Sequence, residues 1–358
     1  MILLNPGPVT LSRSVREALN KPDLCHREPE FGELQASIRR GLLSVYGLPN
    51  DDWAAVLLAG SGTAAVEAML TSLAPRDRKL LVIENGVYGE RMAAIASAHG
   101  IDHCALAHPW GSRVEIDKIN EMLDGQPEIS HVAVVHHETT TGRLNDLAAL
   151  GELCRARGVR LLVDAVSSFG AEALDFERWG IAACAATANK CLHGAPGVSF
   201  VVLRRDQLST AAARTLYLDL ANYCREQDQG GTPFTQPVHV FYALDQALAE
   251  FEAQGGRPAR HQRYRALAQK IRHGLSDLGI EPLLAEDEAS VVLSAYRLPA
   301  GLSYETLHDA LKARGFIIYA GQDGLAKTIF RVAVMGAITD TDIDRLVSAF
   351  RAVLRSEP

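Results

Sequence analysis

The first two-thirds of the chain alternates short, uniformly apolar runs with segments whose apolar residues recur every three or four positions. Apolar runs without strict alternation are typical of strands buried on both faces, and the amphipathic segments between them supply helical crossovers. The expected strands are Ala54–Leu58, Lys79–Ile83, His131–Val135, Arg160–Val163, Ala183–Thr187 and Ser199–Leu203, and the expected helices are Thr63–Leu73, Glu90–His99, Val114–Leu123 and Ala148–Arg157. This pattern predicts an α/β fold with a mostly parallel sheet.

The pattern changes after Leu218. The stretch Asp228–Pro237 contains two glycines and two prolines, which predicts a loop. Beyond it, the expected elements are helices at Val240–Gln254, Arg260–Leu278 and Asp340–Leu354 and strands at Ser290–Ala295, Phe316–Tyr319 and Ile329–Val334. We therefore expect a large α/β domain at 1–250 and a smaller C-terminal α+β domain at 251–358, with the segment 1–15 packed on the smaller one.

The composition is that of a folded globular protein. The 358 residues exceed what one simple core usually holds, because domains typically have roughly 100–200 residues. Hydrophobic residues make up 47% and charged residues 22%, which excludes a disordered or fibrous chain. The net charge of −7 provides no global positive field, so we expect no nucleic-acid partner.

The N-terminal sequence and the cysteines favour a cytoplasmic protein. The apolar run Met1–Leu4 is short, lacks a preceding basic region and ends at Asn5, so it does not read as a signal peptide. No apolar stretch has the length that spans a bilayer, and we expect no membrane partner. The six cysteines are scattered without a CxxC pair, which suits reduced thiols.

A glycine-rich turn stands at the first strand-to-helix junction. In a parallel sheet, ligands bind outside the carboxyl ends of the strands. Gly60-Ser61-Gly62-Thr63 follows the strand Ala54–Leu58 there, and its small residues and helix-start N–H groups suit a phosphate. The same residues are equally consistent with a tight turn that ends in a helix cap.

A carboxylate and a lysine end two further strands. Asp164 follows the strand Arg160–Val163, where it must meet a cation or a donor unless it caps the next turn. Lys190 follows the strand Ala183–Thr187, where partial burial would make its amine nucleophilic. A lysine that extends its charge to solvent at a strand end is the competing interpretation.

The pair His136-His137, followed by Glu138, invites comparison with metal sites. The histidines are adjacent and no HxxxH or HxxEH pattern exists, so we expect no metal. A polar loop that borders a ligand is the better interpretation. The whole set of strand-end residues suits pyridoxal 5′-phosphate, in which a lysine binds the aldehyde, a carboxylate faces the ring nitrogen and helix-start N–H groups hold the phosphate.

The order of motifs adds a family resemblance over nearly the whole chain. In sequence they are Leu4–Pro8 (LNPGP), Gly60–Thr63 (GSGT), Glu84–Gly89 (ENGVYG), His137–Gly142 (HETTTG), Asp164–Gly170 (DAVSSFG) and Ala188–Gly197 (ANKCLHGAPG). This series resembles the class V pyridoxal-phosphate aminotransferases, which implies the fold type I of pyridoxal-phosphate-dependent transferases. Within that family it is most similar to the members that transfer the amino group of 2-aminoethylphosphonate to pyruvate, giving phosphonoacetaldehyde and L-alanine in phosphonate catabolism.

The resemblance implies a role for each matching residue. Lys190 and Asp164 would be the catalytic residues, the first bonded to the cofactor aldehyde and moving the proton, the second facing the ring nitrogen. Tyr88 would stack on the ring, although simple packing is the alternative. The implied cofactor-binding residues are Ser61, Gly62, Thr63, Tyr88, Thr139, Asp164, Val166, Thr187, Lys190 and Thr235.

Two arginines and a second subunit complete the implied site. Arg331 matches a carboxylate-binding arginine, since its planar fork suits the 2-oxo acid acceptor, with a salt-bridge role as the alternative. Thr235, unless it is only a turn residue, matches a threonine that relatives supply from the neighbouring subunit, which implies a homodimer with shared active sites. Arg27, in Cys25–Phe31, resembles a segment of alanine– or serine–glyoxylate aminotransferases, so an enzyme of that type is the alternative function.

One departure bears on the amine donor. Several phosphonate transaminases carry an aromatic and a basic residue just before the stretch that matches Phe234–Pro237. This chain has Gly231-Thr232-Pro233 there, which removes a cation that could recognise a phosphonate. A non-catalytic binding protein with the same fold is disfavoured, because both Lys190 and Asp164 are present.

Overall fold

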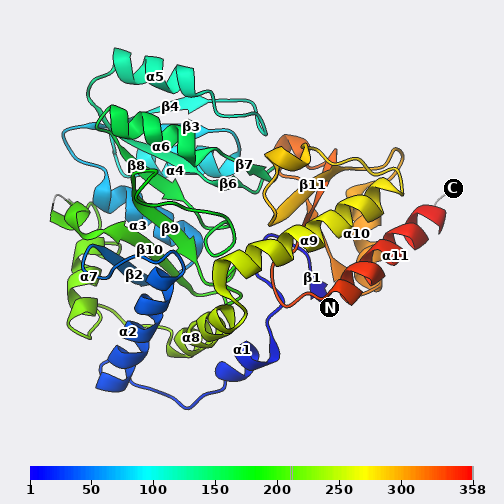
Figure 1. The fold of residues 1–358 in the computed structure, drawn as a ribbon, viewed down its shortest axis with the longest axis horizontal. Coiled ribbons are helices and arrows are strands. Elements are labelled where there is room, and N and C mark those ends of the chain that lie inside the picture. Colours follow the sequence, from blue (N-terminus) through cyan, green and yellow to red (C-terminus); the bar gives the residue numbers. More distant parts are fainter. Residues whose placement is uncertain (210, 212, 357–358) are drawn as a thin grey trace.

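A seven-stranded sheet, here called the large sheet, is the centre of the computed structural model, which describes residues 1–209, 211 and 213–356 (Figure 1). Its strand order is β2 (Trp53–Ala59), β10 (Val198–Arg204), β9 (Ile181–Thr187), β8 (Arg160–Asp164), β5 (Ile129–Val135), β3 (Lys79–Glu84) and β4 (His103–Ala107). Only β10 runs antiparallel to its neighbours. The prediction of a mostly parallel sheet is confirmed, and all six expected strands are present.

The seventh strand, β4, was not expected from the sequence. It lies at the edge of the large sheet beside β3 and is only partly covered, so each of its residues is either half-buried or exposed. Its sequence, HCALA, lacks the run of branched apolar residues that marks the buried strands. An edge position therefore explains both the strand and its weak signal.

Helices cover both faces of the large sheet, which gives three layers (Figure 1). One face is covered by α2 (Pro29–Ser44), α5 (Ile116–Gly125), α6 (Leu147–Ala156) and α8 (Val238–Ala253), and the other by α3 (Gly62–Leu73), α4 (Val87–Ala98) and α7 (Leu220–Asp228). The sequence predicted α3, α4, α5, α6 and α8 but neither α2 nor α7. Helix α2 begins with Pro29 at its first turn, a favoured start, and buries Phe31, Ile38 and Leu42 at helical spacing.

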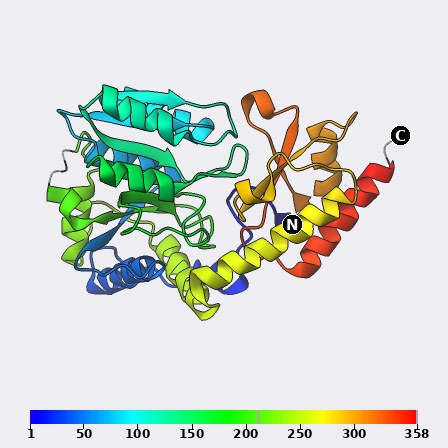
Figure 2. The same ribbon diagram turned by 45° about the horizontal axis from the view of Figure 1, so that its top comes forward.

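A second, antiparallel sheet, here called the small sheet, lies toward the C-terminus. It consists of β11 (Leu293–Arg297), β14 (Ile329–Ala333) and β13 (Tyr319–Ala320). Apart from two short strands of the N-terminal segment and its partner, described below, the other elements are α1 (Arg13–Ala18), β6 (His137–Glu138), β7 (Arg143–Leu144), α9 (Gly256–Ser276), α10 (Tyr304–Ala313), α11 (Asp340–Ser356) and 3-10 turns at Arg205–Ser209, Glu286–Glu288 and Asp323–Leu325. Helix α9 runs from the lobe of the large sheet to that of the small one (Figure 2).

The N-terminal segment joins the C-terminal lobe. Strand β1 (Ile2–Leu3) pairs in parallel with β12 (Phe316–Ile317). Leu4 and Val9 are buried in the same apolar cluster as residues of α9, α11 and the small sheet. Helix α1, only ten residues further along, packs instead on α8 beside the large sheet. The first eighteen residues thus contact both lobes.

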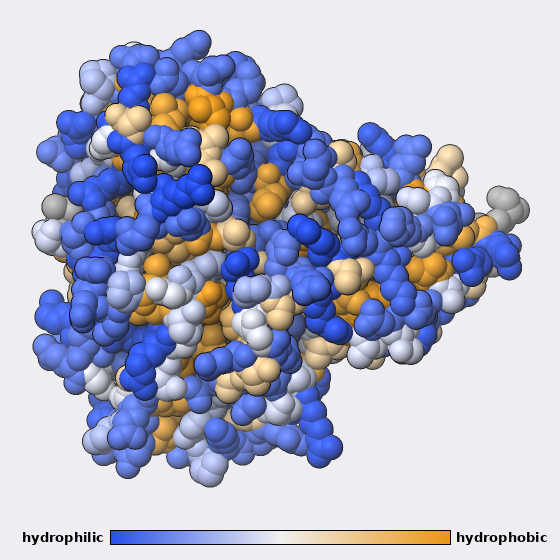
Figure 3. All heavy atoms as spheres, in the orientation of Figure 1, coloured by the Kyte–Doolittle hydropathy of each residue, from blue (hydrophilic) through white to orange (hydrophobic). Residues whose placement is uncertain are grey.

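The outer face shown in Figure 3 is mostly polar, with apolar side chains appearing as scattered patches among charged ones. Within the described residues, no helix combines the length and the apolar character that a membrane span requires.

Close packing of α6 depends on a glycine. A Cβ at Gly151 would lie 2.1 Å from the backbone oxygen of Trp179, which cannot easily move. Gly151→Ala should therefore lower the free energy of unfolding by about 1–3 kcal/mol, as expected when atoms are forced into a packed interior. Urea unfolding would measure the change. The matched control is Gly125→Ala at the end of α5, where no atom lies within 4 Å of the added Cβ; equal losses in both variants would contradict the packing explanation.

Candidate active site at the carboxyl ends of the strands

Two adjoining hollows lie at the carboxyl ends of β5 and β8. Tyr88, Asp164 and Val166 line both of them. The first hollow is completed by Thr63, Val66, Arg91 and Met92, and the second by Val135, His137, Thr139, Ser167 and Lys190. We call the two hollows together the slot. Each has a volume of only about 20 Å³, so a ring that enters the slot between Tyr88 and Val166 must displace side chains. Segments far apart in sequence therefore meet where the parallel topology predicts.

Asp164 is the last residue of β8 and is almost completely buried. Its Oδ1 accepts a hydrogen bond of 2.9 Å from the backbone N–H of Val166. Burial raises the pKa of Asp164 to about 6, while the N–H of Val166 and the charges of Arg91 and Lys190 oppose the rise. The carboxylate is thus largely ionised near pH 7 but poorly solvated, and it would gain from a cation placed in the slot.

Lys190 follows β9 and lies in the same region as Asp164. Burial lowers the pKa of Lys190 to about 8, and the positive charges of Arg331 and Arg91 contribute to the decrease. About a tenth of this amine is therefore neutral near pH 7, far more than for an ordinary lysine, and the neutral form is the one a nucleophile requires. Its Nζ donates a hydrogen bond to the backbone oxygen of Pro6 in the N-terminal segment.

The glycine-rich turn leads directly into α3. Gly62 lies so close to Val166 that a Cβ there would be 2.7 Å from the valine Cγ1, which explains the glycine. Ser61 is exposed at the N-cap position, and its side chain makes no cap hydrogen bond. The N–H groups at the start of α3 therefore remain suited to an anion. The hydroxyl of Thr63 accepts a 3.3 Å hydrogen bond from Arg91.

Sequence reasoning missed two charged residues of this site. Arg91 of α4 lies with its guanidinium carbon 4.7 Å from the centroid of the Tyr88 ring. The carboxylate of Glu138 is buried and accepts hydrogen bonds from the backbone N–H of Tyr88 and from the N–H and hydroxyl of Thr140. Burial raises the pKa of Glu138 to about 7. Arg91 carries no local signal in the sequence, and Glu138 was expected in a polar loop that borders a ligand but was given no role of its own.

Both histidines of the motif are buried. His136 contacts the hydroxyl of Ser168 at 3.0 Å and His137 that of Ser167 at the same distance. Burial lowers their pKa values to about 3 and about 4, so both are neutral near pH 7. Among the described residues, no three His, Cys, Asp or Glu side chains are grouped to hold a metal ion. His137 borders the second hollow, and its Nε2 has no partner in the described part of the chain.

Arg331 reaches the site from β14 of the small sheet. It is almost completely buried, and its guanidinium donates to the backbone oxygens of Ala320 and Thr139 at 2.8 Å each. It also donates a 3.1 Å bond to Gln322 and lies 5.4 Å from the centroid of the Tyr319 ring, and none of the described carboxylates forms an ion pair with it. Burial lowers the pKa of Arg331. This poorly neutralised cation is well suited to an anionic ligand.

Of the other expected residues, Thr139 lines the second hollow, whereas Thr187, Thr235 and Arg27 line neither. Thr187 is buried, and its hydroxyl is bonded to Asn189 at 2.8 Å and to the backbone oxygen of Val198. Thr235 is exposed on the loop before α8. Arg27 is also exposed, and its guanidinium donates to the backbone oxygen of Thr232 at 2.9 Å. A single chain therefore does not bring Thr235 and Arg27 to Lys190.

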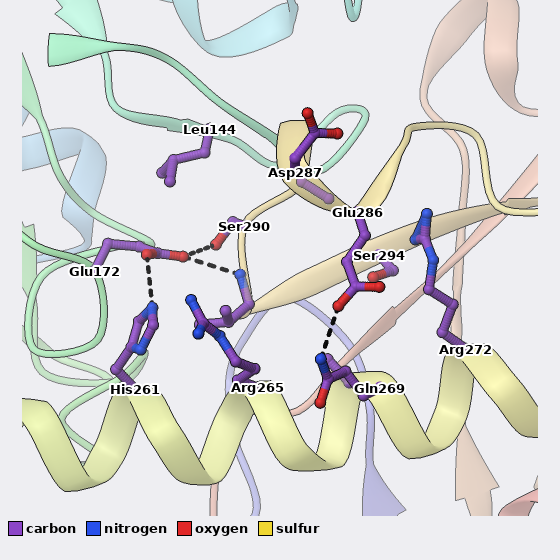
Figure 4. Close-up of a pocket in the computed structure, with 13 residues that line it drawn as sticks. Leu144, Glu172, His261, Arg265, Gln269, Arg272, Glu286, Asp287, Ser290 and Ser294 are labelled. Carbon is purple, nitrogen blue, oxygen red and sulfur yellow. Dashed lines mark hydrogen bonds and ion pairs between the residues drawn. The ribbon is translucent and has the colours of Figure 1, made fainter.

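A larger cavity of about 440 Å³ lies elsewhere, between α9 and the loop before β11 (Figure 4). The carboxylate of Glu172 projects into it and accepts hydrogen bonds from the Ser290 hydroxyl and the Val291 N–H at 2.6 and 2.9 Å. His261 faces the same carboxylate. Neither Lys190 nor Asp164 lines this cavity, so size alone does not identify the reactive site.

The comparison with protein families decides the classification. The model of the class V aminotransferases matches residues 25–346. The chain belongs to this family. It is a transaminase, and the family implies pyridoxal phosphate as cofactor.

Near full-length relatives share one name. The class V aminotransferase described here is 40% identical to a 2-aminoethylphosphonate–pyruvate transaminase of Aeromonas hydrophila, over 97% of this chain and 93% of the relative. It is 39% identical to that of Vibrio cholerae serotype O1, over 98% and 96%, and 36% identical to that of Phocaeicola vulgatus, over 99% of both.

Solved structures confirm the fold type I expected of pyridoxal-phosphate aminotransferases. An alanine–glyoxylate aminotransferase from Nostoc sp. superimposes with a TM-score of 0.92 at 27% identity, over 99% of this chain and 95% of that one. An aspartate aminotransferase from Thermus thermophilus gives a TM-score of 0.90 at 28% identity, over 99% of both chains.

The buried carboxylate makes stability depend on pH. The folded pKa of about 6 for Asp164 exceeds the ordinary 3.8, so the unfolded chain loses this proton first as pH rises. The contribution of Asp164 to stability therefore falls between about pH 4 and pH 6, and this contribution is absent from Asp164→Asn. We expect the cofactor-free variant to be about 1–3 kcal/mol more stable than wild type above pH 7 and little different near pH 4.

Unfolding of both proteins across that pH range would test this expectation. Asp117→Asn, at an exposed position of α5, controls for the loss of one negative charge. If the difference in unfolding free energy between Asp164→Asn and wild type does not grow toward high pH, burial of the Asp164 carboxylate does not destabilise the fold.

Proposed function

We propose that this enzyme transfers the amino group of 2-aminoethylphosphonate to pyruvate with pyridoxal 5′-phosphate as cofactor. The products are phosphonoacetaldehyde and L-alanine. The observation that carries the proposal is the shared name of relatives 36–40% identical over nearly the whole chain. Lys190 and Asp164 line the same hollow, and Arg331 bonds to the backbone of Thr139 at its border, which supports the proposal.

The residues of the slot suit this cofactor. Asp164 would face the ring nitrogen, since a poorly solvated carboxylate favours a proton on that nitrogen. The start of α3, with Ser61, Gly62 and Thr63, would hold the phosphate. Tyr88 and Val166 would cover the two ring faces, Thr139 would lie near the ring hydroxyl, and Thr187 would act only by holding the strand end, because its hydroxyl is already bonded.

Lys190 has the properties of the catalytic amine. Pyridoxal phosphate supplies an aldehyde that bonds to amines and a ring that accepts electrons from the neighbouring carbon. With a pKa near 8, the Nζ of Lys190 can be displaced by the substrate amine and then act as a neutral base. It would take the proton from the substrate carbon that bears nitrogen and deliver it to the carbon of the cofactor's aldehyde group.

Arg331 would bind the anionic end of each substrate. Its fork is already oriented by the backbone oxygens of Ala320 and Thr139 and is not neutralised by a carboxylate among the described residues. Pyruvate offers a carboxylate and 2-aminoethylphosphonate a phosphonate, so one arginine can serve both half-reactions. A preoriented arginine loses little side-chain freedom when it binds.

A homodimer would complete the site with residues that one chain leaves outside it. Leu216 and Tyr217 are 82% and 45% exposed, and the Tyr217 ring packs on Phe234, the neighbour of Thr235. Exposed apolar side chains beside a residue expected to hold phosphate favour a second copy of the chain as the covering surface. Thr235 and the adjacent Arg27–Thr232 contact would then reach the partner's slot.

The alternative is an alanine– or serine–glyoxylate aminotransferase. It is supported by the TM-score of 0.92 to the Nostoc enzyme and by the Arg27 segment. Arg27 also bears on the missing cation before Phe234, because its guanidinium bonds to Thr232 just ahead of that residue. Arg27 therefore supplies a cation near the position where the loop sequence lacks one, which keeps 2-aminoethylphosphonate as the proposed donor.

The half-reaction with the donor alone tests the proposal. Addition of 2-aminoethylphosphonate to the cofactor-loaded enzyme, without any oxo acid, should replace the absorption of the Lys190-bound cofactor with that of pyridoxamine phosphate. Lys190→Ala is the control and should show no turnover. An unchanged spectrum with this donor but conversion by alanine or serine would favour the glyoxylate type.

The dimer has a separate test. Leu216→Asp should place a charge in the proposed interface, shift the enzyme toward monomer in sedimentation experiments and weaken cofactor binding by about ten-fold or more, because Thr235 is lost from the partner's site. Ala352→Asp, at an exposed position of α11, is the matched control. A monomeric wild type with full cofactor affinity would overturn the shared-site proposal.

A further inference from the structure

His193 has an unusual backbone conformation close to the catalytic lysine. It lies three residues after Lys190 and adopts φ +65, in the left-handed region. Of the described residues other than glycine, only His193 and Asp323 have a positive φ. A side chain with a Cβ is disfavoured there, and such strain persists where the surrounding contacts hold it.

The imidazole of His193 makes those contacts with the other lobe. Its Nε2 accepts a 2.9 Å hydrogen bond from the backbone N–H of Gly336 and lies 2.5 Å from the hydroxyl of Tyr264. Because an N–H points at Nε2, this nitrogen carries a lone pair and the proton of the neutral ring is on Nδ1. Burial, together with Arg260 and Arg263, lowers the pKa of His193 well below its ordinary value, which keeps the ring neutral.

These contacts join the segments that carry Lys190 and Arg331. Gly336 follows β14, the strand of Arg331, and Tyr264 belongs to α9. Arg260, one turn before Tyr264, donates a 2.5 Å hydrogen bond to the backbone oxygen of Cys191, next to Lys190. On the opposite side, Arg331 itself bonds to the backbone of Thr139. The lysine loop and the arginine strand are therefore tied at separate points.

We propose that His193 is a positioning residue that sets the separation of the Lys190 amine from the Arg331 fork. The inference rests on the proposed function, in which Arg331 holds the acid group while Lys190 acts on the carbon beside it. In a short substrate the acid group and the reacting carbon are a fixed distance apart, so the Arg331 fork and the Lys190 amine must be separated by a matching distance. A rigid imidazole in a strained conformation, bonded at its far end, fixes that distance better than a flexible side chain would.

Two substitutions separate positioning from folding. The terminal amide of glutamine reaches about as far as Nε2, so His193→Gln keeps an acceptor for Gly336. Asparagine is shorter and cannot reach, but it tolerates the left-handed conformation better than most residues. His193→Asn should therefore fold at least as well as His193→Gln while losing the contact.

The expected result is a split between the variants. In the cofactor-loaded enzyme, His193→Asn should raise KM for pyruvate about ten-fold and lower kcat/KM by roughly ten- to a hundred-fold, as misplacement of reacting groups does. His193→Gln should restore both to within about two-fold. The pH midpoint of the absorption of the Lys190-bound cofactor should move in His193→Asn and not in His193→Gln.

Each other outcome rejects the inference. If both variants lose thermal stability alike but keep the wild-type KM and spectral midpoint, His193 serves only folding. If His193→Gln behaves as His193→Asn, the acceptor for Gly336 is not what matters. The spectral midpoint needs no amine donor, so its failure to move is distinguishable from an error in the proposed substrate, which the wild-type donor experiment reveals.

Discussion

Removal of charge from water at the ends of β8 and β9 is the constraint around which the active site is built. Burial shifts the pKa values of Asp164 and Lys190 in opposite directions, because it raises the pKa of the acid and lowers that of the amine. Each charged form is less stable than in solvent, and their mutual attraction is only one of several compensating terms. A reactive site of this kind needs a rigid, water-poor support, which the three-layer arrangement around the large sheet provides.

The strands of the large sheet could be predicted from the sequence because a strand buried on both faces consists of a continuous run of apolar residues. The strands that became β2, β5, β8, β9 and β10 are continuous apolar runs, and each was located to within two residues at either end. The parallel topology then implied that the turn at Gly62, Asp164 and Lys190 would converge. Weak patterns failed: β4 lies at a partly covered edge, and α2 mixes apolar with charged residues.

Contacts between distant segments could not be foreseen in the same way. Nothing local marks Arg91 as a neighbour of Thr63, and Glu138 was read with the histidines before it rather than with Tyr88. Several contacts between the lobes are made by single side chains, such as Glu172 bonded to Ser290 and Val291 at the wall of the cavity in Figure 4 and Arg331 bonded to Thr139. Pair contacts of this kind depend on the relative placement of two sheets, which periodicity within one segment does not encode.

The position of the N-terminal segment has a consequence for the order of assembly during synthesis. Ile2 and Leu4 donate backbone hydrogen bonds to Gly315 and Ile317, and the backbone oxygen of Leu4 accepts one from Ala333, so this segment can dock only after residues 315–333 have been synthesised. Domains generally fold as their chains emerge, and the large sheet can close around Asp164 and Lys190 long before this pairing exists. The carbonyl of Pro6 that receives the Lys190 amine therefore arrives late. The hydrogen-bond partner of the Lys190 amine is therefore in place only once the C-terminal lobe has bound the N-terminal segment.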